Sequence, residues 1–337
     1  MIGQTAAVAE TAPPVLEVEH LTVAYGSGGR AVTAVEDVSF RVEPGEVVGL
    51  AGESGSGKST LAFALVRLLR PPARRVAGSV RISGADIYAM GPEALRSFRW
   101  AGVSIVTQSA LNSLNPVLTV GTQIADAIQA HKRVSRDEAV ARAAEVVRMV
   151  DLEPGRLRSF PHQLSGGQRQ RAVIAMALAL RPPLVIFDEP TTALDVVVQR
   201  GILEKVRALK AALGFSILFI THDLSLLGEM ADRVLIMYAG RVAESASAEA
   251  LYTHPLHPYT RGLMASFPSV FEVREFLAGI AGSPPDMRRP PAGCRFHPRC
   301  PDAMDACRVT APALTTPGGE VDRQVACHLY GGGETPR

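Results

Sequence analysis

Residues 52–59 read Gly-Glu-Ser-Gly-Ser-Gly-Lys-Ser, which matches the G-x-x-x-x-G-K-[ST] pattern of a phosphate-binding loop. The apolar run Glu46-Val-Val-Gly-Leu-Ala51 precedes this loop and predicts a buried strand. After the loop, apolar residues recur at helical spacing from Ser59 to Leu69. Because the motif requires a strand before it and a helix after it, the sequence predicts a nucleotide-binding α/β fold.

The residue types of the loop suit a phosphate. Glycines let backbone N–H groups converge on phosphate oxygens without Cβ clashes, and the N-terminus of the following helix adds a positive dipole. Lys58 is expected to contact the β- and γ-phosphates of a nucleotide, and the Ser59 hydroxyl to bind Mg²⁺. The loop residues expected to contact the nucleotide are Gly52, Ser54, Gly55, Ser56, Gly57, Lys58, Ser59 and Thr60.

Short apolar strands alternate with helical stretches along much of the chain. Alternating patterns at 16–23 and 35–42 predict strands with one solvated face. Between about 97 and 180 the pattern is mainly helical and predicts an inserted helical subdomain, in which Asp137 to Val150 is the clearest amphipathic helix. The core is therefore expected to be a parallel sheet covered by helices on both faces. The other predicted elements are strands at 79–83, 102–106, 184–187, 215–220 and 234–237 and a helix at 196–213.

Two acidic residues follow the apolar strand at 184–187. Asp188 is placed to hold Mg²⁺ through water, and Glu189 to polarise the water that attacks the γ-phosphate. An apolar strand that ends in Asp-Glu is common, so this pair alone does not identify a catalytic site. A second motif, Leu164-Ser-Gly-Gly-Gln168, stands shortly before it and decides the question.

With this LSGGQ signature the chain resembles the ATPases of ABC transporters. The resemblance implies a P-loop NTPase core, an antiparallel β subdomain and an inserted helical subdomain. It also implies that Tyr25 stacks on adenine, and that Gln108 is the Q-loop glutamine, which contacts Mg²⁺ and takes part in catalysis. In the same way, Asp195 of Ala193-Leu-Asp belongs to the D-loop, and His222 is the switch histidine. Each residue alone would be read as structural, but their joint order and spacing favour the family.

The resemblance further implies a dimer. Ser165, Gly166 and Gly167 would begin a helix whose free N–H groups bind a γ-phosphate held by the opposite subunit. Two nucleotide domains would then close head to tail around two ATP molecules. The whole signature is expected to act on the partner's ATP through Leu164, Ser165, Gly166, Gly167 and Gln168.

Three further segments narrow the resemblance to the ATPases of oligopeptide and dipeptide importers and their nickel-transporting relatives. The implied partners are a second, related ATPase chain, two permease subunits and an extracytoplasmic solute-binding protein. The implied location is the cytoplasmic face of the inner membrane, with the surface around 108–116 against a permease helix. The solute stays open between peptides, nickel and another small solute. The segments are Asn112-Ser-Leu-Asn-Pro116 with Val120-Gly-Thr-Gln-Ile124, His254-Pro-Leu-His-Pro-Tyr-Thr-Arg-Gly-Leu-Met264, and Cys294-Arg-Phe-His-Pro-Arg-Cys300.

The end of the chain has its own chemistry. The expected division is a flexible tail at 1–14, a nucleotide-binding domain at 15–263 and a C-terminal extension at 264–337. Four thiolates on one metal would order this polar extension. Their spacing of five, six and nineteen intervening residues fits neither typical zinc pairs nor the tight ferredoxin run. A [4Fe–4S] cluster is expected, with zinc or free thiols as alternatives. The four candidate ligands are Cys294, Cys300, Cys307 and Cys327.

Arginines accompany the cysteines. Arg288, Arg289, Arg295 and Arg299 are expected to form a solvated basic surface. Since every predicted catalytic group lies before residue 264, the extension is expected to be a separate module from the ATP site.

The composition excludes some function classes. The formal net charge of +2 argues against a dedicated nucleic-acid binder. No run approaches the ~18 apolar residues of a membrane-spanning helix, which argues against a half-exporter. A soluble ABC ATPase of DNA repair or translation is a weaker alternative, because the chain between Gly57 and Leu164 has no room for a long coiled coil and shows no second nucleotide domain. A metal-sensing regulator is the remaining alternative.

Overall fold

The structure is a computed structural model that describes residues 12–107, 113–191, 194–266, 279–319 and 322–331. The predicted N-terminal tail at 1–14 lies almost wholly outside this range.

The centre of the fold is a seven-stranded sheet with the order β11-β10-β9-β3-β8-β7-β6. Its strands are β3 (Val47–Ala51), β6 (Val103–Val106), β7 (Leu184–Asp188), β8 (Ser216–Ile220), β9 (Arg233–Tyr238), β10 (Arg241–Ser247) and β11 (Gln324–Val325). The middle strands pair in parallel, and β10 and β11 complete the edge in antiparallel fashion. Every residue of β3, β7 and β8 is buried, because helices or a second sheet cover both faces. The parallel core predicted from the short apolar runs is confirmed.

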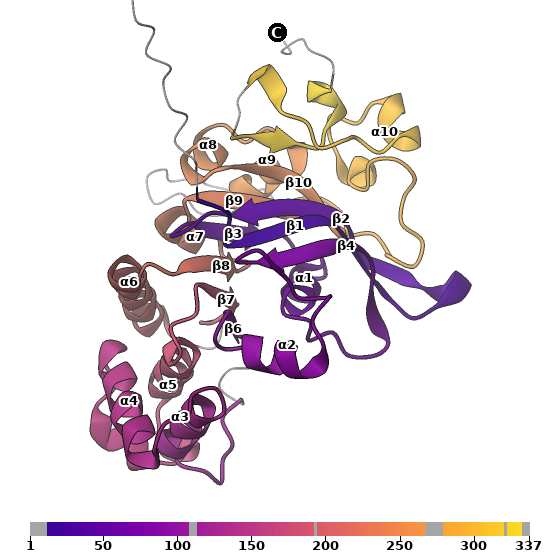
Figure 1. The fold of residues 1–337 in the computed structure, drawn as a ribbon. Helices are drawn as coiled ribbons and strands as arrows, with labels where there is room; N and C mark the ends of the chain where they lie inside the picture. The colour runs from indigo at the N-terminus through magenta and orange to yellow at the C-terminus, as the bar shows by residue number, and fades with distance from the viewer. Residues whose placement is uncertain (1–11, 108–112, 192–193, 267–278, 320–321, 332–337) are drawn as a thin grey trace, which may run out of the picture.

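A smaller antiparallel sheet has the order β2-β1-β4-β5, and its apolar side chains share a buried cluster with those of the central sheet. Helix α1 (Lys58–Leu65) lies between the two sheets and contacts β1, β2 and β7 (Figure 1). The apolar side chains of both sheets meet around it in one buried cluster. The strands are β1 (Leu16–Tyr25), β2 (Val32–Val42), β4 (Ala73–Ile82) and β5 (Ala85–Asp86), followed by α2 (Pro92–Phe98).

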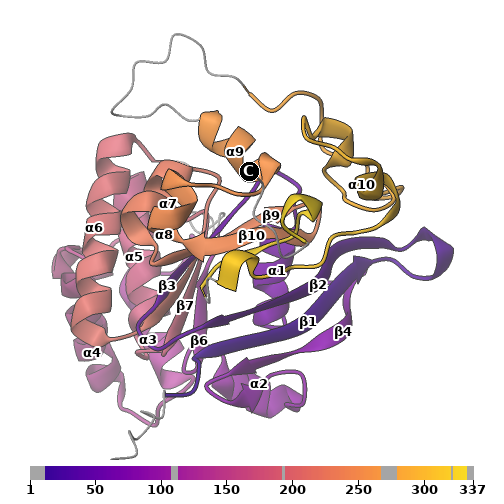
Figure 2. The same cartoon turned by 90° about the horizontal axis from the view of Figure 1, so that it is seen from above.

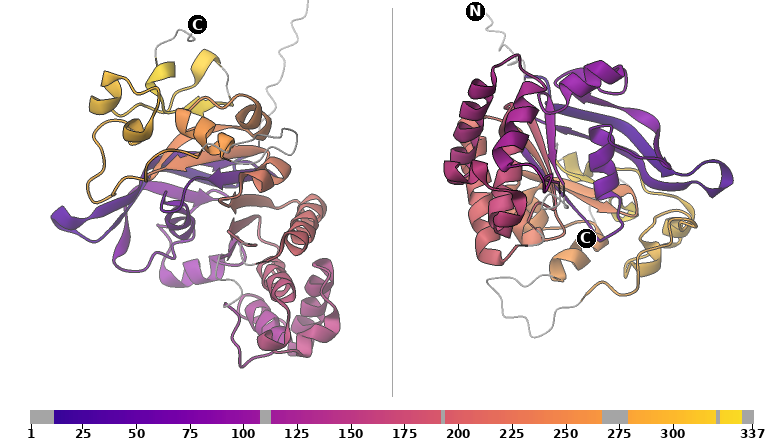
Figure 3. Two further views of the ribbon diagram at one scale, coloured as in Figure 1. Left: turned by 180° about the vertical axis from the view of Figure 1, so that it is seen from behind. Right: turned by 90° about the horizontal axis from the view of Figure 1, so that it is seen from below.

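The helical subdomain is the lobe of α3 (Val120–Gln129), α4 (Arg136–Met149) and α5 (Gly166–Leu178) at one end of the molecule (Figures 1 and 3). Thr119, Ser135 and Ser165 cap these three helices with their side-chain oxygens, which explains where each helix starts. Helix α6 (Val196–Leu213) has the bounds predicted from the sequence, and α7 (Leu224–Met230) follows β8.

The chain after β10 is called here the C-terminal segment (residues 248–337). It contains α8 (Ala248–Thr253), α9 (Pro258–Ala265), α10 (Asp305–Val309) and β11, and it lies beside β9 and β10 at the opposite end from α3 and α4 (Figures 1 and 2). Phe296 is buried against Tyr238 and Tyr259, so the segment packs on the core. Within the described part of the chain, no helix is both long and apolar enough to span a membrane.

Candidate nucleotide-binding site

The phosphate-binding loop connects β3 to α1, as predicted. Gly52 has φ of 148° and Gly57, the N-cap of α1, has φ of 104°. A Cβ would lie 2.2 Å from the Met237 carbonyl oxygen at Gly52, and 2.4 Å from the Ala34 carbonyl oxygen at Gly57. Only glycine fits both the conformation and the space, so the loop can lie tightly against β9 and β2.

Lys58 holds the loop together from inside. Its Nζ donates hydrogen bonds to the carbonyl oxygens of Gly52 (2.7 Å) and Glu53 (3.0 Å). Burial lowers the pKa of Lys58, and the carboxylates of Glu189, Asp188 and Glu53 oppose that shift. Lys58 is therefore the buried cation of the loop, and the phosphates of a nucleotide are expected to lie against it.

Ser59 and Asp188 form the candidate magnesium site. The Ser59 hydroxyl donates to Asp188 Oδ1 at 3.2 Å, across the gap between α1 and the end of β7. Burial raises the pKa of the Asp188 carboxyl, against the lowering effect of this hydrogen bond. A buried carboxylate beside a hydroxyl offers the hard oxygen ligands that Mg²⁺ prefers, so these two residues fit the ion.

Glu189 and His222 lie together at the ends of the neighbouring strands β7 and β8. Glu189 has φ of 49°, and its N–H donates to the Ile220 carbonyl at 2.9 Å, which fixes the turn after β7. Its Oε1 is 3.2 Å from His222 Nδ1. The carboxyl ends of parallel strands meet at one edge of a sheet, which explains why residues far apart in sequence converge here.

Lys58, Ser59, Glu189 and His222 line a cavity of about 670 Å³, whereas Asp188 is not among the described lining residues. At the adenine end predicted from the resemblance, the Tyr25 hydroxyl is 3.0 Å from Thr60 Oγ1. Sequence reasoning missed Met287, which comes from the C-terminal segment and has no motif to reveal it. Gly52 and Ser56 belong to the loop without lining the cavity. The described lining residues are Tyr25, Val32, Ala34, Ser54, Gly55, Gly57, Lys58, Ser59, Thr60, Glu189, His222 and Met287.

The signature lies on another part of the chain. Ser165 is the N-cap of α5: its hydroxyl accepts from the Gln168 N–H, and the Gln168 side chain accepts from the Ser165 N–H. Leu164 is buried, and a Cβ on Gly167 would lie 2.7 Å from Val198 Cγ1, so α5 packs closely against α6. None of the signature residues is among the described residues that line the cavity.

Other predicted positions have mixed outcomes. Asp195 is the N-cap of α6 and accepts from the Val198 N–H at 2.9 Å. Gln108 and Ala193 lie outside the described residues. Leu114, in the segment expected to face a permease, is buried with 4% exposure, whereas Val117 beside it is 74% exposed.

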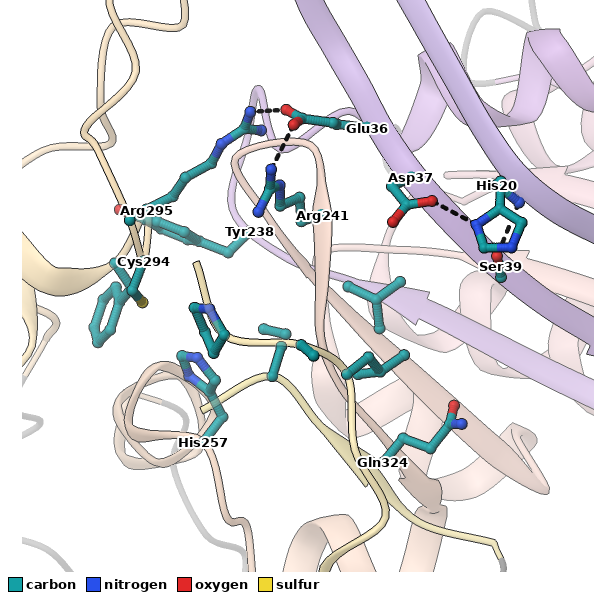
Figure 4. Close-up of a pocket in the computed structure, with 18 residues that line it drawn as sticks. His20, Glu36, Asp37, Ser39, Tyr238, Arg241, His257, Cys294, Arg295 and Gln324 are labelled. Atoms are coloured by element: carbon teal, nitrogen blue, oxygen red, sulfur yellow. Dashed lines mark hydrogen bonds and ion pairs between the residues drawn. The ribbon is translucent and has the colours of Figure 1, made fainter. Parts of the chain in front are cut away.

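The prediction of a solvated basic surface is wrong for two of its four arginines. The Arg299 side chain is 6% exposed and pairs with Glu53, and that of Arg295 is 8% exposed and pairs with Glu36. Figure 4 shows Arg295 from the C-terminal segment and Arg241 from β10 approaching Glu36. This ion triad borders a second cavity of about 460 Å³, separate from the nucleotide site. The local group of arginines led to a wrong prediction because their acidic partners are distant in sequence.

None of the four cysteines, all of which lie in the described part of the chain, forms a disulfide bond. Within the described ranges, no group of three or more His, Cys, Asp or Glu side chains is placed to hold a metal ion, so the predicted metal site is not confirmed. The thiols are nevertheless near one another. Burial raises the pKa values of Cys294, Cys300 and Cys327, and charge on neighbouring cysteines raises each of them further. The Cys294 N–H donates to the Cys307 carbonyl at 2.9 Å.

Comparison with known proteins shows which families this chain matches. Residues 35–192 match the family described as ABC transporter, and residues 243–307 match the one described as oligopeptide/dipeptide transporter, C-terminal region. The chain is 46% identical over 318 residues to the oligopeptide transport ATP-binding protein OppD of Mycobacterium tuberculosis, covering 93% of this chain and 52% of that protein. It therefore spans about half the length of that relative.

A shorter relative and a solved structure extend the comparison. A putative peptide import ATP-binding protein of Brucella abortus is 42% identical over 312 residues, covering 92% of this chain and 94% of that protein. The dimeric ATP-binding cassette MJ0796, solved in a post-hydrolysis state with ADP and Pi, superposes with a TM-score of 0.62 at 29% identity, covering 69% of this chain and 98% of that one.

Proposed function

This chain belongs to the ABC transporter family, in the group with the oligopeptide/dipeptide transporter C-terminal region, and we propose that it hydrolyses ATP to energise peptide uptake through a membrane transporter. The observation that carries the proposal is the convergence of four groups on one cavity, with a fifth bonded to one of them. Lys58, Ser59, Glu189 and His222 line the cavity, and Asp188 accepts a hydrogen bond from Ser59.

Each of these groups has a part in the proposed hydrolysis. Lys58 and the loop N–H groups bind the phosphates, and Ser59 and Asp188 would hold Mg²⁺. The ion would neutralise charge on the phosphate oxygens. Glu189 accepts the proton of the attacking water, and His222, 3.2 Å away, orients the Glu189 carboxylate.

The assembly is proposed from the position of the signature. The free N–H groups at the start of α5 can bind phosphate, yet the signature is not among the described lining residues of this chain's own cavity. We therefore infer a head-to-tail pair with a second ATPase chain, attached to two permease subunits at the cytoplasmic face and served by a solute-binding protein. Gln108 would contact Mg²⁺ and take part in catalysis, and Asp195 would belong to the D-loop.

Reconstitution tests this function. The chain is co-expressed with candidate permease subunits and a candidate second ATPase, the solute-binding protein is added, and uptake is measured in vesicles with radiolabelled tripeptides or dipeptides and, separately, ⁶³Ni²⁺. ATP-dependent peptide uptake is expected. Uptake of nickel without uptake of peptides would identify nickel as the solute. ATP hydrolysis without uptake of any solute would favour a non-transport ATPase.

We also propose that the four thiols hold one metal centre, with a [4Fe–4S] cluster before zinc. Support comes from the proximity of the sulfurs and from backbone N–H groups that hydrogen-bond to three of them: Phe296 to Cys294, Asp302 to Cys300 and Leu329 to Cys327. Burial raises the pKa values of these thiols, and the three hydrogen bonds oppose that rise. Such hydrogen bonds to sulfur tune iron–sulfur centres. Anaerobically purified protein should be brown, with about four irons per chain. One tightly bound zinc per chain would show that the thiols form a zinc site. Protein without any metal would show that the thiols are free.

A further inference from the structure

The C-terminal segment reaches the phosphate-binding loop through an ion pair. Arg299 Nη1 lies 2.8 Å from Glu53 Oε2, and Nη2 lies 3.0 Å from Glu53 Oε1, so the guanidinium grips both carboxylate oxygens. Arg299 also donates to the carbonyl of Ala281 (2.9 Å) and to the Tyr238 hydroxyl (3.3 Å). With a side chain only 6% exposed, it is held in one orientation by the core and by its own segment.

The same loop residue is held from two other directions. The backbone N–H of Glu53 donates to the Tyr259 hydroxyl at 2.8 Å, and Tyr259, in α9, is fully buried. The carbonyl oxygen of Glu53 accepts from Lys58 Nζ at 3.0 Å. Its amide, side chain and carbonyl are therefore all fixed, two of them by residues that follow β10.

Because Glu53 is negatively charged, its ion pair with Arg299 affects nucleotide binding. Its carboxylate is close enough to Lys58 to act on that lysine's charge, and the phosphates of ATP would lie against Lys58. An unpaired acid at this point of the loop would repel the triphosphate. Arg299 is the cation that neutralises it, and Met287 of the same segment lines the nucleotide cavity.

We propose that the C-terminal segment is part of the ATP site, with Arg299 as a positioning residue that neutralises Glu53 and holds the phosphate-binding loop in its binding conformation. This inference rests on the ATP binding proposed above. It adds a positive group that lies outside every motif of the nucleotide-binding domain and more than two hundred residues after the loop.

The test is a double-mutant cycle on the full-length chain, with MgATP affinity measured by titration calorimetry. Arg299→Gln should weaken binding on the order of tenfold, because Glu53 is left charged beside the phosphates. Adding Glu53→Gln to that variant should restore the affinity to within about threefold of wild type, because removing both partners leaves no unpaired charge. Arg308→Gln, which removes an exposed arginine of the same segment, should bind MgATP as wild type does.

Rescue separates this role from a purely structural one. Wild-type affinity in Arg299→Gln would overturn the inference, and so would weak binding that Glu53→Gln does not restore. If Arg299→Gln does not fold, Glu53→Gln alone decides: the remaining Arg299 cation predicts affinity equal to or tighter than wild type, and weaker binding contradicts it. A wild-type chain that binds no MgATP would overturn the proposed function together with this inference.

Discussion

Replacing Glu189 by Gln should leave ATP binding intact and nearly abolish hydrolysis. Glu189 is the only acid among the described residues that line the nucleotide cavity, so no lining carboxylate is placed to take over proton acceptance. The Glu189 side chain is 15% exposed, and its backbone is fixed by the hydrogen bond to Ile220. The amide is isosteric, so the geometry around His222 is preserved while the base is lost.

The expected loss of turnover follows from the absence of another carboxylate among the described lining residues. Loss of a general base costs about 10²- to 10⁴-fold, and we expect the upper half of that range because no substitute base lines the cavity. A loss of about 10³- to 10⁴-fold corresponds to roughly 4 to 5.5 kcal/mol in the barrier. The Kd for MgATP should stay within about threefold, because one tenfold step needs about 1.4 kcal/mol and the phosphate-binding groups are untouched.

The assay is phosphate release by the assembled transporter at saturating MgATP, together with size-exclusion chromatography for an ATP-trapped dimer. Glu204→Gln is the matched control, because this glutamate of α6 has a side chain 67% exposed, and its turnover should stay within about twofold of wild type. Turnover above about a tenth of wild type in Glu189→Gln would refute the assignment of the base.

Three further predictions address the metal site, the permease surface and the cysteines. Asp188→Asn should increase the free energy of unfolding of the nucleotide-free protein at pH 7 by about 1 kcal/mol, which is measured as a higher melting temperature. The reason is that burial raises the folded-state pKa of Asp188, so its contribution to stability falls as pH rises from the unfolded pKa through the folded one; a lower melting temperature contradicts this. Val117→Asp, at an exposed site, should cut peptide uptake about tenfold with unchanged ATP affinity, whereas the equally exposed control Val309→Asp should not; normal uptake by Val117→Asp would remove this surface from the permease contact. Cys300→Ser should lower the metal content and weaken MgATP binding severalfold, because Cys300 adjoins Arg299; unchanged affinity in calorimetry would show that the cysteines and the loop are independent.

The sequence alone predicted the elements whose information is local. The apolar periodicity of α6 and the apolar runs of β3, β7 and β8 need no distant partner to be recognised. The glycines of the phosphate-binding loop likewise carry their conformational requirement in their own identity.

Strand β10 shows why other parts could not be predicted. Its sequence includes Glu244, which is completely buried, so it lacks the apolar pattern of a core strand. The carboxylate is tolerated because it accepts from the backbone N–H groups of Leu256 and His257 and pairs with Arg323. All three partners follow later in the chain, and no local pattern announces them.

Distant partners also connect the end of the chain, which was expected to be a separate module, to the nucleotide-binding domain. Three acids of the nucleotide-binding domain take arginine partners from the C-terminal segment: Glu36 pairs with Arg295, Glu53 with Arg299 and Glu244 with Arg323. Removing the segment would take these partners from all three acids at once. Glu36 would keep Arg241, whereas Glu244 is fully buried, and an unpaired buried charge costs about 3–5 kcal/mol.

A truncated chain that lost transport would therefore not reveal a metal-sensing regulator, because the ATP site and the core would be damaged by the deletion itself. Substitutions that keep the segment in place are needed to separate the two roles. Arg299→Gln with its Glu53→Gln partner probes the link to the phosphate-binding loop, and Cys300→Ser probes the thiols one residue away. If Cys300→Ser weakens ATP binding only while Arg299 and Glu53 are both present, the thiols act on the ATP site through this ion pair.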